Sequence, residues 1–408
     1  MVENRRICLD IQINSRPVQK FEGTKIYVST GDSEDMENGQ KIGFYGRPSR
    51  ANVEPKLNDV IFAKMSNTDK TFLINNDLVK NIYSTGFFDV SSKKIYPRFL
   101  YYIIQSHEFD SFKNAYSEGT TQISISDKRL KKIRLTYETN FDKQIIISKF
   151  LNQKIGVIND MMSNIEMQKD NIIRYRDSLI TEIVTKGLNS AVQFNETNSD
   201  LIKMKPSHWK LNKIKYVSFL VTDGAHVSPE TDNGVKPFIS TVDIKDGYID
   251  FNNCLKTSLK SYYQFVANNC NPKRNDVLIS KDGTVGRTVV VDFDEDFVIG
   301  SSLVIIRPIT NKINPYYLEY FLRSNVIQDL LVMLMSGSAL KRVSVTKNAN
   351  LPILVPPMTE QTAIVRYLDE KMQNIQELLR LKEKKIEELK KYKKSLIYEC
   401  VSGKMEVE

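Results

Sequence analysis

Residues that commonly perform catalysis or bind metals are few in this sequence, and they are isolated from one another. The three histidines, His107, His208 and His226, have no cysteine or second histidine at a metal-ligand spacing. Neither of the glycine-rich phosphate-binding motifs, GxGxxG and GxxxxGK[ST], occurs. A zinc site, histidine-based catalysis and a nucleotide-binding loop are therefore not indicated, and the positive case for an enzyme is weak.

Turns rich in glycine, hydroxyl and basic residues offer a different chemistry, because they donate hydrogen bonds to phosphate oxygens and to base edges. Four segments have this composition: residues 63–70 (AKMSNTDK), 118–124 (EGTTQIS), 280–287 (SKDGTVGR) and 336–342 (SGSALKR). Ordinary solvated loops are the alternative interpretation for each of them. The candidate nucleic-acid contacts in these turns are Lys64, Asn67, Lys70, Thr120, Gln122, Lys281, Thr284, Arg287, Ser338, Lys341 and Arg342.

The charge of the chain favours a polyanionic partner. Its 408 residues include 58 Lys and Arg against 49 Asp and Glu, which gives a net charge of +9. An ordinary basic protein stays an alternative, because net charge alone identifies no partner. Residues 380–394 (RLKEKKIEELKKYKK) are especially basic. They indicate either a solvated helix face or a surface near a nucleic-acid backbone or an acidic partner subunit.

The cysteines and the apolar segments bear on location. Cys8, Cys254, Cys270 and Cys400 lie far apart without a CxxC spacing, which is typical of reduced thiols. No apolar run approaches the roughly 20 residues of a membrane span, and the N-terminus has no signal-like stretch. We therefore expect a soluble, cytoplasmic protein without a membrane partner.

The elements that must position these turns occur twice in the chain. When residue 144 is placed on residue 361, residues 144–184 align with 361–401 without a gap. Further matches, in the same order, pair residues 55–64 with 272–281, 96–104 with 314–322 and 23–30 with 234–241. The chain is therefore a duplicated unit: a globular part, then a long helix, then both again.

Both repeated helices have a narrow apolar seam, because their apolar residues recur at spacings of three, four or seven, as in a coiled coil. Each helix has roughly 42 residues and a length of about 63 Å at about 1.5 Å per residue. Such a helix is not stable with its seam in water, so we expect the two copies in one chain to pair, and a homodimer is the alternative. The seam candidates include Leu151, Ile158, Ile165, Tyr175, Leu179, Leu368, Ile375, Leu389, Tyr392 and Leu396.

The globular parts combine helices and strands, so the predicted fold class is α+β. Residues 276–293 predict two strands around a glycine turn, and residues 314–337 predict a helix that begins at proline and ends at glycine. Nothing before Gly23 clearly matches residues 205–230, so the first unit is predicted to be cut short at its front. The predicted boundaries are a first globular unit at 1–141, a long helix at 142–186, a linker at 187–205, a second globular unit at 206–357 and a second long helix at 358–402.

The duplicated order resembles the specificity subunit of type I restriction–modification systems. The second helix carries TEQTAIVRYLDEK (359–371) and YKKSLIYECVSGK (392–404), and the first carries DKQIIISKFLNQK (142–154) and YRDSLITEIVTKG (175–187). The segments that are similar to the family's target-recognition domains are PSHWK (206–210), TDGAH (222–226), DVLISKDGTVG (276–286) and INPYYLEYFLRS (313–324). They add Thr222, Asp223 and His226 to the candidate DNA contacts. The first unit departs from the pattern by lacking the Trp and TDG.H segments and by having Lys143 where the family has glutamate.

The resemblance implies a subunit that recognises double-stranded DNA and catalyses nothing itself. Each target-recognition domain would bind one half of a split target, and the two long helices would pair antiparallel within the chain and separate them. Two modification subunits would dock on the seam residues of the two helices and methylate adenine with S-adenosylmethionine. Two restriction subunits could join and cleave DNA with ATP and Mg. No cofactor and no metal is expected in this chain.

Two other functions stay open at this point. A coiled-coil homodimer that binds DNA or acts as a scaffold, without methylase partners, would show twice the chain mass in solution. An enzyme with an unrecognised site would be active in a methylation assay on the isolated chain, in which we expect no activity.

Adding one heptad to each long helix, at matching positions, should change the DNA target while preserving the apolar seam. The insertion adds about 10.5 Å at about 1.5 Å per residue, or roughly three base pairs. We expect either a spacer longer by roughly two to four base pairs or loss of specific binding, because three base pairs also rotate the second half-site by about 100°. Methylome sequencing measures the spacer. A folded variant that methylates the original site at the original rate would exclude the helices as the ruler.

Overall fold

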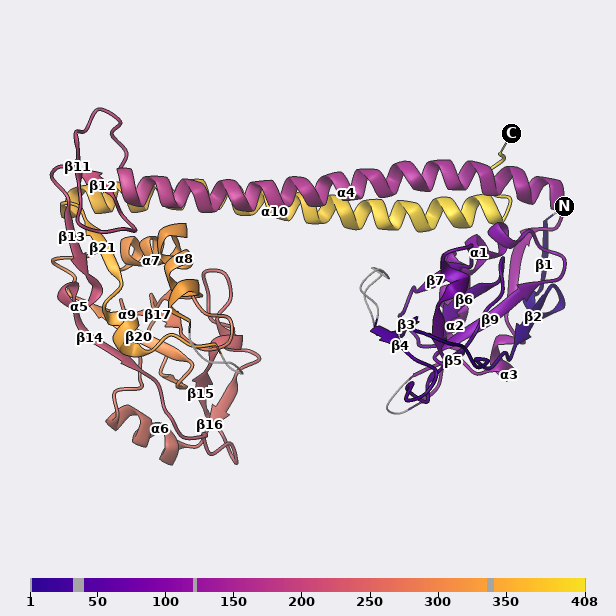
Figure 1. The fold of residues 1–408 in the computed structure, drawn as a ribbon, viewed down its shortest axis with the longest axis horizontal. Coiled ribbons are helices and arrows are strands. Elements are labelled where there is room, and N and C mark those ends of the chain that lie inside the picture. The colour runs from indigo at the N-terminus through magenta and orange to yellow at the C-terminus, as the bar shows by residue number, and fades with distance from the viewer. Residues whose placement is uncertain (1, 32–39, 120–122, 336–340, 408) are drawn as a thin grey trace. The chain divides into compact units, whose positions relative to one another are not determined.

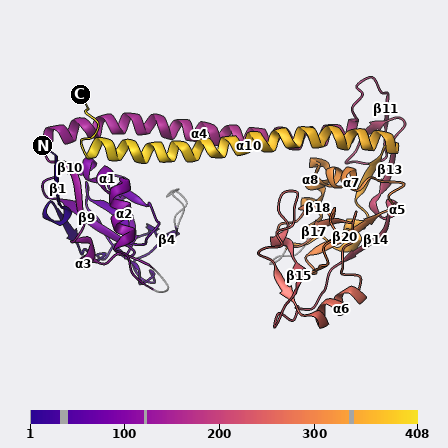
Figure 2. The ribbon, with the colours of Figure 1, turned by 180° about the vertical axis from the view of Figure 1, so that it is seen from behind.

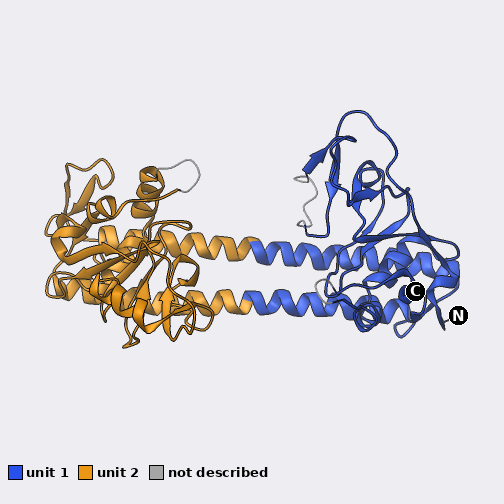
Figure 3. Ribbon diagram, turned by 90° about the horizontal axis from the view of Figure 1, so that it is seen from below, with its two compact units in different colours: residues 1–166, 382–408 blue, residues 167–381 orange. Residues whose placement is uncertain are grey.

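The computed structural model describes residues 2–31, 40–119, 123–335 and 341–407. The chain forms two compact units, shown in different colours in Figure 3. Unit 1 comprises Met1–Glu166 and Lys382–Glu408, and unit 2 comprises Met167–Leu381. Each unit therefore contains one globular part and half of each long helix. Within the described residues, no helix has the length and the apolar composition that crossing a membrane requires.

Unit 1 contains two small sheets and a separate antiparallel pair formed by the first and the last strand of its globular part. The antiparallel sheet has the strand order β2-β9-β6-β7, and a second sheet has the order β4-β3-β8-β5, in which β3 and β8 are parallel. The strands are β1 (Val2–Arg6), β2 (Ile11–Asn14), β3 (Lys25–Val28), β4 (Gln40–Ile42), β5 (Ala51–Val53), β6 (Val60–Ala63), β7 (Thr71–Leu73), β8 (Ile82–Ser84), β9 (Phe87–Ser92) and β10 (Arg134–Glu138). The helices are α1 (Pro97–Gln105), α2 (His107–Ala115), α3 (Asp127–Leu130) and the first half of α4 (Phe141–Lys186).

Unit 2 repeats this topology, except that its second sheet lacks a counterpart of the fourth strand and that it has further elements of its own. Its sheets have the orders β14-β20-β17-β18 and β16-β15-β19, and β13 pairs with β21. The strands are β11 (Phe194–Glu196), β12 (Met204–Pro206), β13 (Lys210–Lys213), β14 (Ser218–Asp223), β15 (Lys236–Ile239), β16 (Leu255–Thr257), β17 (Val277–Ser280), β18 (Thr288–Val290), β19 (Val298–Ile299), β20 (Leu303–Pro308) and β21 (Pro352–Val355). The helices are α5 (Ile214–Val217), α6 (Leu259–Ala267), α7 (Pro315–Arg323), α8 (Asn325–Leu334), α9 (Val345–Ala349) and the first half of α10 (Met358–Val401). The mixed α+β fold is thus confirmed in both units.

The front of unit 1 has the same topology as the front of unit 2. Strand β1 pairs with β10, the last strand before α4, just as β13 pairs with β21 before α10. Strand β2 pairs with β9 as β14 pairs with β20. Residues 2–14 therefore supply strands that the sequence comparison alone could not align. The front of unit 1 is shorter than its counterpart, because β2 has four residues where β14 has six.

Two local predictions differ from the structure. The helix predicted at 314–337 is interrupted at Ser324, whose extended backbone separates α7 from α8. The buried Ser324 hydroxyl donates to the carbonyl of Phe321 at 2.6 Å, which closes the end of α7. The segment expected to be an aperiodic linker contains the antiparallel pair β11 and β12.

The long helices pair antiparallel within the chain. In unit 1 the beginning of α4 and the end of α10 share one hydrophobic core, and in unit 2 the end of α4 and the beginning of α10 share another. Figures 1 and 2 show the two helices side by side. The buried seam residues of unit 1 are Ile147, Leu151, Ile155 and Ile158 of α4 with Leu396, Ile397, Cys400 and Val401 of α10. Those of unit 2 are Leu179, Ile180, Ile183 and Val184 of α4 with Ile364, Val365 and Leu368 of α10.

A buried glutamine fixes the first turn of α10 to the globular part of unit 2. The Gln361 side chain is fully buried. Its Oε1 accepts from the backbone N–H of Asn314 at 2.8 Å, and its Nε2 donates to the carbonyls of Pro356 at 2.9 Å and Lys312 at 3.1 Å. One side chain thus joins the start of α7, the end of β21 and α10.

In unit 1 the corresponding glutamine, Gln144, makes the same kind of contacts. Gln144 is 1% exposed. Its Oε1 accepts from the backbone N–H of Tyr96 at 2.7 Å, and its Nε2 donates to the carbonyl of Glu138 at 2.8 Å. Tyr96 precedes α1 as Asn314 precedes α7. The identity of Gln144 and Gln361 in the repeat therefore has a structural cause: each joins a long helix to its own globular part.

A neighbouring contact explains two departures of the first copy from the second. In unit 2, Glu360 Oε2 accepts from the indole Nε1 of Trp209 at 3.0 Å and lies 2.8 Å from Nε2 of His208. Unit 1 has no tryptophan, and Lys143, the counterpart of Glu360, is exposed. Unit 1 therefore lacks both members of this contact.

Replacing Gln361 by alanine should destabilise unit 2, since the backbone N–H of Asn314 and two carbonyls lose their partners. Leaving buried polar groups unsatisfied costs roughly 1–3 kcal/mol. Trp209 is the only tryptophan and is 1% exposed, so its fluorescence during denaturant unfolding reports on unit 2. The matched control is Gln373→Ala, an exposed position on the same helix. Equal unfolding midpoints for the two variants would contradict this role for Gln361.

Candidate nucleic-acid interface

Four of the predicted contact residues of unit 2 meet where three segments come together. Lys281 Nζ lies 3.1 Å from Oδ2 of Asp223, and His226 Nε2 lies 2.8 Å from the same oxygen. Asp282 connects this group to Arg342, whose Nε is 3.8 Å from Asp282 Oδ1. The group combines the end of β14, the turn after β17 and the segment before α9, and we call it the unit 2 cluster.

The TDGAH segment runs tightly against another strand, and this proximity requires glycine. A Cβ on Gly224 would lie 2.2 Å from the carbonyl oxygen of Ile299 and 2.3 Å from that of Gly300. The next residue, Ala225, donates its N–H to Ile299 at 2.9 Å. His226 is therefore held at a defined position beyond the strand end.

The members of the unit 2 cluster divide into buried and exposed side chains. The Lys281 side chain is 8% exposed, and its backbone N–H and C=O bond to Ser302 and Val343 at 2.8 and 3.0 Å. Lys281 therefore supports the cluster from within. The side chains of His226 and Arg342 are 69% and 57% exposed. Both side chains are accessible to a ligand, and each also faces a carboxylate of the cluster. Of the other candidates in unit 2, Lys341 and Thr284 are also exposed, and Thr222 is half-buried in β14.

Arg287 lies apart from this cluster, at a cavity of about 560 Å³ within unit 2. Its Nη1 donates to the carbonyl of Ile244 at 3.0 Å. Asp246, near the same cavity, is bridged by Arg176 Nη1 at 2.9 Å and Arg323 Nη2 at 3.2 Å. The charged lining consists of Arg176, Lys245, Arg287 and Arg323 against Asp177 and Asp246. The cavity is consequently basic.

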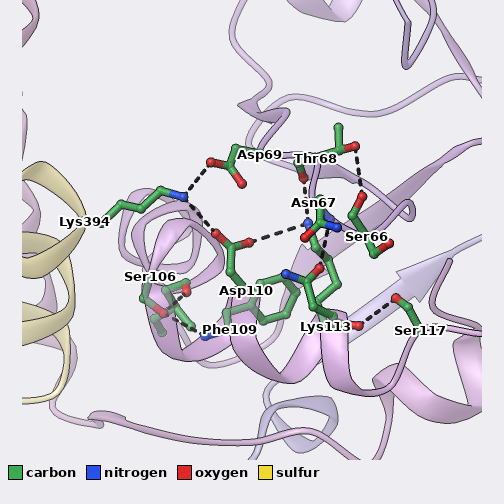
Figure 4. A network of polar contacts seen from close by, with 12 residues as sticks. Ser66, Asn67, Thr68, Asp69, Ser106, Phe109, Asp110, Lys113, Ser117 and Lys394 are labelled. Carbon is green, nitrogen blue, oxygen red and sulfur yellow. Dashed lines mark hydrogen bonds and ion pairs between the residues drawn. The ribbon is translucent and has the colours of Figure 1, made fainter. Parts of the chain in front are cut away.

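The corresponding region of unit 1 is closed by ion pairs, as Figure 4 shows. Lys394 Nζ of α10 lies 2.6 Å from Asp69 and 3.4 Å from Asp110. Lys113 Nζ lies 3.5 Å from Asp110 and donates to the carbonyl of Thr68 at 2.6 Å. Burial raises the pKa of Asp110 and lowers that of Lys113, so each charged form depends on the other. The 63–70 turn is thereby fastened to α2 and to α10.

The predicted contacts of unit 1 are only partly available. Asn67 is exposed, with its backbone N–H bonded to Asn114 Oδ1 at 2.9 Å. Lys64 is half-buried and places Nζ 4.6 Å from the ring centroid of Phe88, and Lys70 is also half-buried. Thr120 and Gln122 of the first globular part, and Ser338 of the second, lie outside the described residues.

The helix residues predicted for the seam also divide into two groups. Tyr175 and Tyr392 occupy the same position of the repeat, and both are 57% exposed. They lie outside the buried seam, which continues through Ile180 and Ile397 instead. Leu151, Ile158, Leu179, Leu368, Ile375 and Leu396 are buried, and Ile165 and Leu389 are half-buried.

Several charged residues of these sites carried no individual signal in the sequence. Asp282 follows Lys281 in the chain, but only the fold brings it near Arg342. Arg176 and Arg323 meet at Asp246 from helices that are far apart in sequence. The basic 380–394 segment was a general signal, and in the structure its member Lys394 is paired with carboxylates of unit 1.

Comparison with known proteins finds similarity to one family over part of the chain. Residues 206–391 match the family model described as the type I restriction modification DNA specificity domain. The chain is 25% identical over 291 residues to the type I restriction enzyme EcoBI specificity subunit of Escherichia coli, a match that covers 69% of this chain and 60% of that protein, less than two thirds of its length. It is 22% identical to the type I restriction enzyme MjaVIII specificity subunit of Methanocaldococcus jannaschii, covering 95% of this chain and 88% of that protein.

A solved structure has the same fold. A chain from a study of complex assembly and conformational transition of the type I R-M system superposes with a TM-score of 0.67 and 20% sequence identity. The match covers 97% of this chain and 98% of that chain. The architecture of two mixed α and β units joined by two long helices is therefore shared along nearly the whole length.

Lys281→Met should reduce the stability of unit 2 by roughly 1–3 kcal/mol, because Asp223 would lose its charged partner in a mostly buried place. Arg342→Ala, which removes an exposed cation of the same cluster, should change stability by less than about 0.5 kcal/mol. Denaturant unfolding followed by Trp209 fluorescence compares the two. Unchanged stability of the Lys281 variant would show that this lysine is not a supporting residue.

Proposed function

We propose that this chain is a type I restriction–modification specificity subunit, which recognises a DNA sequence and directs partner enzymes to it. In this function each globular unit binds one half of a split target in double-stranded DNA. The observation that carries the proposal is the duplication of one topology, in which the unit that matches the DNA specificity domain has its counterpart in the other. Two similar units in one chain suit two half-sites.

The exposed members of the unit 2 cluster have the chemistry that this function needs. Arg342 can donate to phosphate oxygens and to a guanine edge in the major groove, and Lys341, its exposed neighbour in the chain, can also donate to phosphate. The buried pair of Lys281 and Asp223 holds the segments from which these donors project. The basic cavity beside Arg287 offers a further place for phosphate.

The long helices supply the surface for partner proteins in this proposal. Two modification subunits would dock on them, one at each copy of the repeated helix segment, residues 175–187 and 392–404. The exposed Tyr175 and Tyr392 of these segments are candidates for contact. Methylation with S-adenosylmethionine, and cleavage with ATP and Mg where restriction subunits join, would be performed by those partners. The chain would work in the cytoplasm and would provide the address for the reaction rather than its catalysis.

Methylome sequencing of cells that express the chain together with a modification partner tests the function directly. We expect methylated adenines in one split sequence with a fixed spacer, absent from cells that express the partner alone. Methylation without any consensus sequence, or an identical pattern with and without the chain, would reject the proposal.

Arg342→Ala should weaken DNA binding in a way that identifies its contact. A base contact would cost roughly 1–3 kcal/mol and relax one target position. A phosphate contact would weaken all sequences alike and lower the salt slope by about one unit. The control is Lys312→Ala. Lys312 is exposed and lies four residues after the end of β20, whereas the unit 2 cluster lies at the beginning of that strand. Arg287→Ala gives the same test for the cavity. Binding that matches the control in affinity, salt slope and sequence preference would exclude these side chains as DNA contacts.

Exchange of residues 206–355 for the matching unit of a relative should change one half of the recognised sequence and leave the other. The reason is that each unit has its own sheets and its own core. Methylome sequencing of the hybrid gives both halves at once. A folded hybrid with both halves altered would mean that the units do not bind their half-sites independently.

A further inference from the structure

An exposed aromatic ring stands at the end of a rigid loop in unit 1. Residues 43–50 connect β4 to β5. Tyr45 in this loop is 78% exposed, the highest value among the large hydrophobic side chains that the structure describes. A single exposed aromatic residue is ordinary on a protein surface. Its surroundings decide whether it is a binding feature.

The loop backbone is fixed by one arginine. The Arg47 guanidinium lies 4.2 Å from the ring centroid of Phe44, donates to the carbonyl of Phe44 at 2.9 Å and donates to that of Ala51 at 3.2 Å. The N–H of Ala51 also donates to Pro48 at 2.8 Å. Gly46 has φ +80°, a conformation that favours glycine at the turn. The loop is thus preorganised, and binding would require little ordering.

The ring of Tyr45 packs against Phe44, and most of its remaining surface is exposed. Phe44 packs on the small core that contains Tyr27 and Ile42, and it meets Tyr45 edge to face with ring centroids 5.3 Å apart. A shallow hollow of about 340 Å³ lies beside the ring. It is lined by Phe44, Tyr45, Gly46, Arg47, Pro48, Ser49 and Asn52. A flat ligand can therefore approach the face of Tyr45 without displacing any part of the core.

One cation lies over this ring, and a second occurs at the end of the same loop. Lys20 Nζ lies 5.7 Å from the ring centroid of Tyr45, and both Lys20 and Arg50 are exposed. Lys25, beside Phe21, is already paired with Glu54 at 2.6 Å, so it contributes less free charge. An exposed aromatic face with a cation beside it is the combination by which proteins stack nucleobases while holding the adjoining phosphates.

Among the residues that the structure describes, unit 2 has no counterpart of this loop. Its strand β16 is followed by Ser258 and the helix α6, whereas β4 of unit 1 is followed by the loop that presents Tyr45. A contact made by this loop would therefore belong to one half-site only.

From this geometry we propose that the Tyr45 ring stacks on a nucleobase at an opened base step of the half-target bound by unit 1, with Lys20 at a neighbouring phosphate. The inference rests on the proposed DNA-recognition function and adds to it a residue that selects or positions sequence. An apolar or aromatic side chain inserted at a base step favours steps that unstack easily, so the contact gives sequence preference through deformability as well as through stacking.

Selection from a random duplex pool by the full-length chain tests this. Wild type should enrich a split sequence. Tyr45→Ala should bind the enriched duplex between about fivefold and about a hundredfold more weakly and should relax the preference at a step in one half only. Tyr45→Phe, which keeps the ring, should bind like wild type. The matched control is Tyr216→Ala, which removes an exposed tyrosine of unit 2 that also has a lysine over its ring, Lys215, at 5.2 Å.

The Tyr45→Trp variant adds a direct signature of stacking. Its new indole is exposed, while the native Trp209 is buried, so quenching of the exposed emission by the enriched duplex reports contact with a base. Quenching together with the Tyr45→Ala loss is the expected result. Two results would overturn the stacking role alone. One is a Tyr45→Ala variant that enriches the same sequence with the same affinity as wild type and Tyr216→Ala. The other is a Tyr45→Trp emission that the duplex leaves unchanged. Failure of the wild-type chain to enrich any sequence would overturn the proposed function and this inference with it.

Discussion

The structure depends on the burial of the apolar seams of the two long helices, which pack with each other and with the globular part of each unit. Helix α4 begins in unit 1 and ends in unit 2, and α10 runs from unit 2 to unit 1. Burying a leucine or isoleucine side chain stabilises a protein by roughly 1.5–3 kcal/mol, and an isolated helix with an exposed apolar stripe would forgo this. The antiparallel pairing supplies it within one chain. The end of α10 completes the core that begins with β1 and β2, so the last residues of the chain pack with the first strands.

The coupling of each helix to its globular part is polar and specific. Gln144 and Gln361 satisfy backbone groups from two elements each, and a hydrophobic residue of the same size could not do so. These two side chains define where a globular part begins relative to its helix. In unit 2 the contact of Glu360 with Trp209 adds a second connection, which unit 1 lacks at both positions. The repeat therefore preserves the glutamine and varies the contact beside it.

On this common frame the two units carry different surface chemistry. Unit 1 uses Lys394, Asp110 and Lys113 to close the space between its turn and the long helix. Unit 2 leaves a basic cavity of about 560 Å³ there, around Arg287. Unit 1 presents the Tyr45 loop where unit 2 has α6. Under the proposed function, a difference of this kind would let the two units bind half-sites of different sequence, because surface loops can vary while the frame that carries them stays the same.

Periodicity and self-similarity are local properties, and the sequence by itself determined the features that depend on them. The spacing of apolar residues specified both long helices, and the shared offset specified two α+β units in the same order. The turn around Gly283 was visible for the same reason. The contacts between segments distant in the chain required the tertiary structure. Lys281 lies in a turn with the composition of an exposed contact, but it is buried against Asp223. Tyr175 has the spacing of a seam residue, but it is exposed. The counterparts of the front of unit 1 are evident only from the pairing of β1 and β2. Side-chain burial and strand pairing depend on which distant residues arrive at the same place, and residue type and spacing along one segment do not contain that information.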